Sequence, residues 1–249
     1  MNKVDHLVDI LKSLNSEENR EQTIEEAKEF LSTIDAKGLS IAEQRLIDEG
    51  LGYEDMQQLC KIHLELLADK VEKMKKSLPA GHVVSTLISE HEKILSFLDE
   101  LEAVNKNIQQ LPDYQPGSQD FNKLSHIAEH LVETELHHKR EEEILFPELN
   151  KRGVYGPPAI MREEHNQMRP KKHELKALAE KTGEIDFEEF KKTLDRLVKF
   201  LIPILRDHIF KENNILYPTA VEVIEDEKVW DKLKQACDEI GYCCFTPSR

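Results

Sequence analysis

The chain of 249 residues is predicted to be an all-α protein, in which an up-down-up-down four-helix bundle follows a small N-terminal helical domain and ends in a C-terminal helical tail. Apolar residues recur at steps of three and four positions along almost the whole sequence, and no stretch alternates in the manner of a β-strand. After residue 82, four long periodic segments are joined by short connections rich in turn-forming residues. Long helices with short connections pack as antiparallel neighbours, which is the arrangement of a four-helix bundle.

The segment before the bundle is predicted to form several short helices. Ser16 can cap one of the first, and the last extends from about residue 53 to residue 76. The stretch SLPAGH at residues 77–82 then interrupts the helical pattern, because proline and glycine end helices. We therefore expect an N-terminal helical domain at residues 1–78 and a second domain at residues 79–249.

The second domain contains the helices of the bundle. They are predicted at residues 82–111, 119–149, 158–181 and 186–217. Their connections, LPDYQPGSQ, NKRGVYGPP and KTGEID, are rich in proline, glycine and short polar residues. A further helix at about residues 226–240 is predicted to pack against the outside of the bundle.

The composition argues against several classes of function. A net charge of −15 disfavours binding to nucleic acids or anionic membranes, because both would repel the chain. No apolar segment approaches the roughly 20 residues that span a bilayer, and the first residues carry too many charges for a signal peptide. The cysteines are too few for a disulfide scaffold, so we expect a cytoplasmic protein. They are Cys60, Cys237, Cys243 and Cys244.

An internal repeat is the strongest functional signal. The segment HHKREEEILFP at residues 137–147 returns as HIFKENNILYP at residues 208–218, an offset of 71 residues. The alignment matches His137 with His208 and Glu141 with Glu212. Each pair has the spacing His-x-x-x-Glu, which places both side chains on one face of a helix, one turn apart.

Each copy of the repeat also has a histidine on the preceding helix. His91 lies 46 residues before His137, and His165 lies 43 residues before His208. His91, His208 and Glu212 fall on apolar stripes, where burial of an ionisable group costs several kcal/mol unless it is paired or ligated. Glu90 and Glu164 are candidates to orient ligand imidazoles.

The repeat therefore predicts a dinuclear metal site. The predicted ligands are His91, His137, Glu141, His165, His208 and Glu212. The carboxylates would bridge two ions on the order of 3.5–4 Å apart, and each ion would keep two imidazoles and an open position. Nitrogen and oxygen donors favour iron or manganese, with zinc as a further alternative.

The ligand register in the second bundle helix is left open. The apolar stripe Leu124, Ala128, Leu131 and Leu145 favours His138 and Glu142 instead of His137 and Glu141, whereas the repeat favours the latter pair. A local π-bulge would reconcile the two patterns, because it shifts the helical phase.

With these motifs, residues 82–218 resemble the hemerythrin-like family, whose HHE cation-binding domain is a four-helix bundle with a di-iron centre. The spacing of four histidines and two glutamates is especially similar to the branch that repairs iron centres. Oxygen-carrying members use a fifth histidine in an HxxxH run. Here the run His126 and His130 lies earlier in its helix, where nothing else matches, so reversible oxygen carriage is in doubt.

The N-terminal segment AEQRLIDEGLGYEDMQQLCKIH resembles an uncharacterised helical domain that is often fused to hemerythrin-like domains. Together the resemblances imply a protein with two iron ions that reacts with or senses oxygen, nitric oxide or related oxidants, with a link to iron-centre repair. The alternatives are a gas or iron sensor that signals to a protein partner through the N-terminal domain, and iron storage or oxygen binding without turnover. No motif beyond the metal ligands indicates catalysis, so enzymatic activity is left open.

Overall fold

The computed structural model describes His6, Met74 and residues 76–247, and in this part of the chain it contains helices and no strands. The short helices predicted before residue 74 lie outside the described residues. The described helices, including two π-helical turns named η1 and η2, are α5 (Val83–Gln110), α6 (Gln119–Glu133), α7 (Glu135–Arg140), η1 (Glu141–Leu145), α8 (Phe146–Asn150), α9 (Gly156–Glu180), α10 (Phe187–Lys211), η2 (Glu212–Leu216), α11 (Tyr217–Val223) and α12 (Glu227–Ile240).

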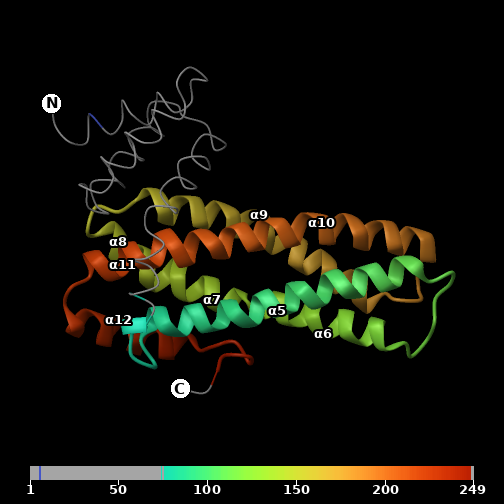
Figure 1. The fold of residues 1–249 in the computed structure, drawn as a ribbon, viewed down its shortest axis with the longest axis horizontal. Helices are drawn as coiled ribbons and strands as arrows, with labels where there is room; N and C mark the ends of the chain where they lie inside the picture. The colour runs from blue at the N-terminus through green and yellow to red at the C-terminus, as the bar shows by residue number, and fades with distance from the viewer. Residues whose placement is uncertain (1–5, 7–73, 75, 248–249) are drawn as a thin grey trace.

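These elements form the predicted four-helix bundle. Its long members are α5, the run from α6 to α8, α9, and the run from α10 to α11, and they lie antiparallel in Figure 1. Each packs against the next along the chain, and α10 packs back against α5. The all-α prediction is confirmed for the described residues.

The helix starts follow from local capping. The side chains of His82, Ser118 and Asp186 accept hydrogen bonds from backbone N–H groups in the first turns of α5, α6 and α10. Such caps satisfy donors that have no partner inside the helix. At the far end of the bundle, Gly183 adopts a φ of +85°, and a Cβ atom there would lie 2.7 Å from the ring of Tyr114. Glycine therefore lets the connection between α9 and α10 pack against Tyr114 in the connection between α5 and α6.

Each of the two π-helical turns allows a helical run to continue through a proline. In η1 and η2 the chain makes a wider turn, so the N–H groups of Phe146 and Tyr217 donate to carbonyls five residues earlier. Pro147 and Pro218 then occupy the first turn of the next helical segment, where a missing N–H is tolerated. The predicted helix end at residue 217 was consequently wrong, because α11 continues to Val223.

The apolar core has two clusters along the bundle axis. One surrounds Leu98, Leu131 and Leu201, and the other contains Phe146 and Tyr217. Each fully buried large apolar side chain contributes about 1.5–3 kcal/mol. No helix within residues 76–247 is long and apolar enough to cross a membrane.

The C-terminal tail covers one side of the bundle. As predicted, its helix α12 packs outside the bundle, against α5, α7 and η1. After Gly241, the tail runs beside α6 and α7, where Cys243 Sγ lies 3.5 Å from the carbonyl of Glu133. Thr246 Oγ1 donates a 2.6 Å hydrogen bond to Glu90 on α5. The end of the described chain is thus attached to the bundle interior.

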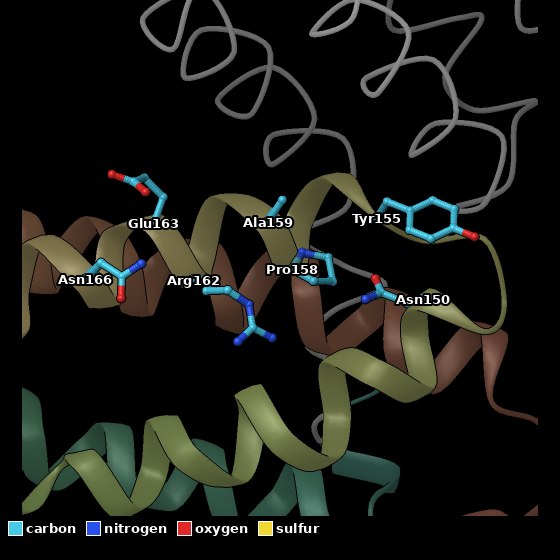
Figure 2. A pocket seen from close by; sticks show the side chains of 7 residues that line it. All are labelled: Asn150, Tyr155, Pro158, Ala159, Arg162, Glu163 and Asn166. Carbon is cyan, nitrogen blue, oxygen red and sulfur yellow. The ribbon is translucent and has the colours of Figure 1, made fainter.

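A groove of about 320 Å³ lies at the start of α9 (Figure 2). Its lining residues are Asn150, Tyr155, Pro158, Ala159, Arg162, Glu163 and Asn166. None of them is a histidine or a cysteine. Arg162 links α9 to η1 at the surface, because its guanidinium donates to the backbone carbonyl of Glu142 at 3.1 Å.

Candidate metal centre

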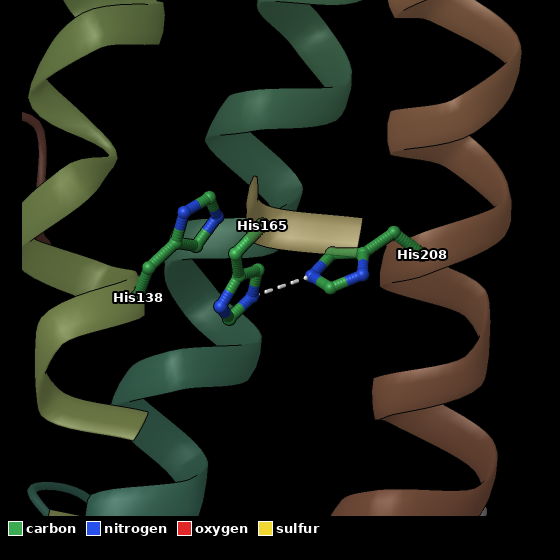
Figure 3. A group of neighbouring side chains, drawn as sticks. All are labelled: His138, His165 and His208. Atoms are coloured by element: carbon green, nitrogen blue, oxygen red, sulfur yellow. Dashed lines mark hydrogen bonds between the residues drawn. The ribbon is translucent and has the colours of Figure 1, made fainter. Parts of the chain in front are cut away.

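Four imidazoles from four helices meet in the middle of the bundle. His91 comes from α5, His137 from α7, His165 from α9 and His208 from α10, and each is at most 1% exposed. They form two pairs. The Nε2 atoms of His91 and His137 are 3.2 Å apart, and those of His165 and His208 are 2.9 Å apart (Figure 3).

Two glutamates lie between the histidine pairs. Glu141 and Glu212 are the first residues of η1 and η2, and both are fully buried. The carboxylate of Glu212 is 3.1 Å from His91 Nε2 and 2.9 Å from His208 Nε2. The carboxylate of Glu141 is 3.6 Å from both His137 Nε2 and His165 Nε2. Each carboxylate therefore contacts one histidine of each pair, so the structure brings together all six residues that the repeat singles out.

The outer nitrogen of each imidazole has its own partner. His137 Nδ1 is 2.7 Å from Glu90, His208 Nδ1 is 2.8 Å from Glu164, and His165 Nδ1 is 2.8 Å from Glu142. His91 Nδ1 is 2.9 Å from the side-chain oxygen of Asn213. All four partners are acceptors, so they fix the proton of a neutral ring on Nδ1. The Nε2 lone pairs of all four rings then point into the centre.

Buried oxygens without hydrogen-bond donors lie inside the centre. Both oxygens of Glu212 and the Oε2 atom of Glu141 have no hydrogen-bond donor, although they are buried. A neutral ring with its proton on Nδ1 does not satisfy these oxygens, because its Nε2 atom presents a lone pair to another lone pair; a second proton on a ring or a cation is needed to pair with them. Buried acceptors without partners cost several kcal/mol in total. A metal ion is the natural partner for this set of nitrogen and oxygen atoms.

The pKa values show how the centre holds charge without a metal. Burial lowers the pKa of His137 to about 4, more than Glu90 raises it, so this ring is neutral. Burial also lowers the pKa of His208, but Glu212 and Glu164 outweigh that effect and raise it to about 9. Burial and the adjacent Glu212 raise the pKa of Glu141 well above its usual value. A proton on His208, beside Glu212, therefore supplies positive charge to the centre without a metal.

Two buried ion pairs support the outer carboxylates. Glu90 accepts hydrogen bonds from Arg140, at 2.6 Å, and Glu164 pairs with Lys211. Arg140 and Lys211 occupy equivalent positions of the 71-residue repeat, so the repeat includes this outer layer as well as the inner residues. Burial raises the pKa of Glu90, but His137 and Arg140 lower it more, to about 2. An ionised carboxylate at this position makes the His137 ring a stronger donor to a metal.

One of the positions at which the two copies differ lies inside the centre, where one copy has Phe146 and the other has Tyr217. The Tyr217 hydroxyl donates a 2.8 Å hydrogen bond to Glu141 and lies 3.4 Å from His91 Nε2 and 3.3 Å from His137 Nε2. Sequence reasoning missed this residue. Its signal was the change from phenylalanine to tyrosine at the aligned position just before each proline.

Lys172 is a second residue that the sequence did not single out. Its side chain is 0% exposed, and its ammonium group donates to Thr134 at 2.7 Å and pairs with Glu135 at 2.5 Å. The ammonium also lies 3.5 Å from His138 Nδ1. Burial lowers the pKa of Lys172 more than the adjacent Glu135 raises it. The ion pair with Glu135 places the ammonium beside His138, whose ring is stacked on His165.

His138 and Glu142, the alternative pair in the register, occupy different surroundings. The His138 ring is stacked on His165 with centroids 3.8 Å apart, and it faces His208 (Figure 3). Glu142 lies at the edge of the centre, where it contacts His165 Nδ1 and Arg169. The inner position in η1 is held by Glu141. His126 and His130 lie on α6 and are not among the six residues of the centre.

Comparison with protein families gives two matches. The model of the hemerythrin HHE cation-binding domain matches residues 82–220, which include the whole centre. The model of DUF438, a family of unknown function, matches residues 7–73. A search of curated proteins found no match to the chain.

Proposed function

The chain belongs to the family of hemerythrin HHE cation-binding domains, and on that premise we propose that its centre holds two iron ions and reacts with or senses oxygen, nitric oxide or a related oxidant. The proposed ligands are His91, His137, Glu141, His165, His208 and Glu212. One observation carries the proposal: four imidazoles, whose Nδ1 atoms all face acceptors, direct their Nε2 atoms toward two buried carboxylates that have oxygens without donors.

The ligands divide naturally between two ions. His91 and His137 would serve one ion, and His165 and His208 the other. Glu212 lies close to both pairs and Glu141 contacts one ring of each, so both carboxylates are placed to bridge. Shared carboxylates offset the repulsion between two cations, because each cation faces negative charge. The mixed nitrogen and oxygen donors suit iron, with manganese or zinc as alternatives.

This geometry also supports His137 and Glu141 over His138 and Glu142 as the ligands from the second bundle helix. His138 Nδ1 faces the Lys172 ammonium, which opposes a second cation there. Glu142 is already occupied by His165 and Arg169 at the edge of the centre. The HxxxH run that provides a fifth histidine in oxygen-carrying members is not formed at His165, because the residue one turn later is Arg169.

Iron, when bound, would supply the ability to bind a diatomic molecule and exchange electrons with it. The protein would control access and protons. The bundle buries the centre, so bulk water is excluded from it. The Tyr217 hydroxyl is a proton donor on the side of His91 and His137, and the Lys172 ammonium places a positive charge on the other side. These two groups favour ligands that gain negative charge on binding.

A sensor is the second candidate function. The match of residues 7–73 to a separate family gives the bundle a fused N-terminal partner, which is the organisation expected of a protein that relays metal state or gas binding. Iron storage is a weaker alternative, because six ligands for two ions provide little capacity.

Anaerobic iron loading tests the proposal directly. Metal analysis should give two irons per chain, and Mössbauer and optical spectra should change on titration with oxygen or nitric oxide. The variant His208→Asn should bind fewer than two irons, whereas His173→Asn, which alters an exposed histidine of α9, should bind two. One iron or none in the parent chain would overturn the dinuclear assignment.

A further inference from the structure

A second group of metal-ligating side chains lies outside the centre, between α6 and the C-terminal tail. His130 and Glu133 come from the last turns of α6, and Cys244 comes from the tail. Cys244 Sγ lies 2.8 Å from Glu133 Oε2 and 3.4 Å from His130 Nδ1. His130 Nδ1 is in turn 3.4 Å from Glu133 Oε2. Three different donor atoms therefore meet at one point.

The size of this triangle fits a divalent cation. Zinc binds nitrogen and oxygen ligands at about 2.0–2.2 Å and thiolates at about 2.3 Å, so tetrahedral ligands lie roughly 3.4–3.8 Å apart. Two sides of the triangle already have that length. The third, between sulfur and carboxylate, is shorter because the thiol donates a hydrogen bond to Glu133. A cation that replaces this proton needs only a small movement of the exposed Cys244 side chain.

The surroundings hold the three donors in place. The backbone N–H of Cys244 donates to the other oxygen of Glu133 at 2.7 Å. The His130 ring is stacked on Phe97 with centroids 4.8 Å apart, and Phe245 from the tail makes a T-shaped contact with both rings. His126 Nε2 lies 3.0 Å from His130 Nε2, so it is positioned to accept the ring proton and leave Nδ1 free for a cation.

We propose that His130, Glu133 and Cys244 form a second metal site, specific for a thiolate-binding divalent cation of the zinc class. The site has three protein ligands and leaves a fourth position to water or another small ligand. Metal binding replaces the thiol proton, so Cys244 binds as a thiolate and one proton is released. The site differs chemically from the bundle centre, whose six residues offer only nitrogen and oxygen.

Cobalt is a suitable probe because a cobalt–thiolate bond has a charge-transfer band in the near ultraviolet, and imidazole and carboxylate ligands do not produce it. The full chain, loaded with iron, is titrated with Co²⁺ without oxygen and in the presence of a phosphine reductant. The Cys60→Ser background removes a thiol that lies outside the described residues. The band should grow to one equivalent of cobalt and should disappear when Zn²⁺ is added.

Two variants show which sulfur is the ligand. Cys244→Ser should abolish the band. Cys243→Ser is the matched control and should retain it, because Cys243 is buried and its sulfur faces Arg140 and the carbonyl of Glu133. His126→Asn changes an exposed side chain and should weaken cobalt binding by roughly 10-fold while leaving the band position unchanged. Absence of the band in the background protein, or its persistence in Cys244→Ser, would overturn the proposal, whatever the iron content of the bundle centre.

Discussion

Replacing Tyr217 with phenylalanine removes one hydroxyl group from the centre and keeps the aromatic ring. Phenylalanine is already present at the aligned position, as Phe146, so this packing is compatible with the fold. The hydroxyl donates to Glu141, whose other oxygen has no donor. Without it, the metal-free protein would bury a carboxyl group with neither oxygen satisfied.

The cost of one additional buried acceptor without a partner is about 1–3 kcal/mol. At about 2–4 °C per kcal/mol for a domain of this size, the unfolding midpoint of the metal-free protein should fall by roughly 2–12 °C. With metal bound, the same substitution should cost less, because a cation would then face the Glu141 carboxylate. The destabilisation should therefore be larger without metal than with it.

Fluorescence of Trp230 provides the assay. It is the one tryptophan of the chain, and it is buried in the same apolar cluster as Tyr217, so it reports unfolding of the bundle. Tyr242→Phe is the matched control, because its hydroxyl makes an exposed bond to Asp238 and should contribute less than about 0.5 kcal/mol. Equal stability of Tyr217→Phe and the parent protein, both without metal, would refute the assigned hydrogen bond to Glu141.

Four further predictions concern the metal. Glu212→Gln should weaken magnetic coupling between the two irons, since one bridge is lost; unchanged Mössbauer and magnetic data would contradict bridging. Glu141→Gln should alter the optical spectrum of the iron-loaded protein more than Glu142→Gln does, and the reverse order would move the ligand register by one residue. Iron affinity should fall as the pH drops from 8 to 6, by about tenfold per pH unit for each proton displaced, because His208, with its pKa raised to about 9, must lose a proton before it can bind. Calorimetry in buffers of different ionisation enthalpy measures the number of protons released on iron binding. A value of zero would argue against displacement of the His208 proton. Removing metal with a chelator should lower the Trp230 unfolding midpoint, since a ligand at 1,000 times its Kd adds about 4 kcal/mol of stability; an unchanged midpoint would place the metal elsewhere.

The regular part of the fold was predictable because helical periodicity and turn residues are local signals. Three of the four bundle helices and the tail helix start and end close to their expected positions. The exception is the helix that continues beyond Pro218. Its extension depends on the π-helical turn in η2, and the pattern of apolar residues does not reveal a turn of that kind directly.

The six inner residues of the centre could be identified because the repeat aligned two copies of the same motif. The stripe that favoured His138 and Glu142 also marks a buried face, since Leu131, His138 and Leu145 are all at most 2% exposed. His138 lies beside the centre, stacked on His165, so burial alone does not separate it from His137. The choice between the two registers therefore depends on the repeat and on which side chains point at Glu212.

Contacts between distant segments could not be predicted in this way. Thr246 reaches Glu90 across 156 positions of the chain, and nothing in the irregular tail sequence indicates that contact. The burial of Lys172 is equally non-local, because its partners Thr134 and Glu135 lie on another helix. Such pairs depend on how the helices are rotated against each other, which one sequence does not specify.

Each glutamate of the centre contacts a histidine from the other copy of the repeat. His91 of the first copy lies against Glu212 of the second, and His165 of the second lies against Glu141 of the first. Neither copy alone contains a complete set of donors for either ion. A chain cut in the connection at residues 151–155 would therefore yield two fragments that depend on metal for reassembly. Added iron should promote association of the two fragments, so a fragment-complementation assay would report metal binding as association of the fragments.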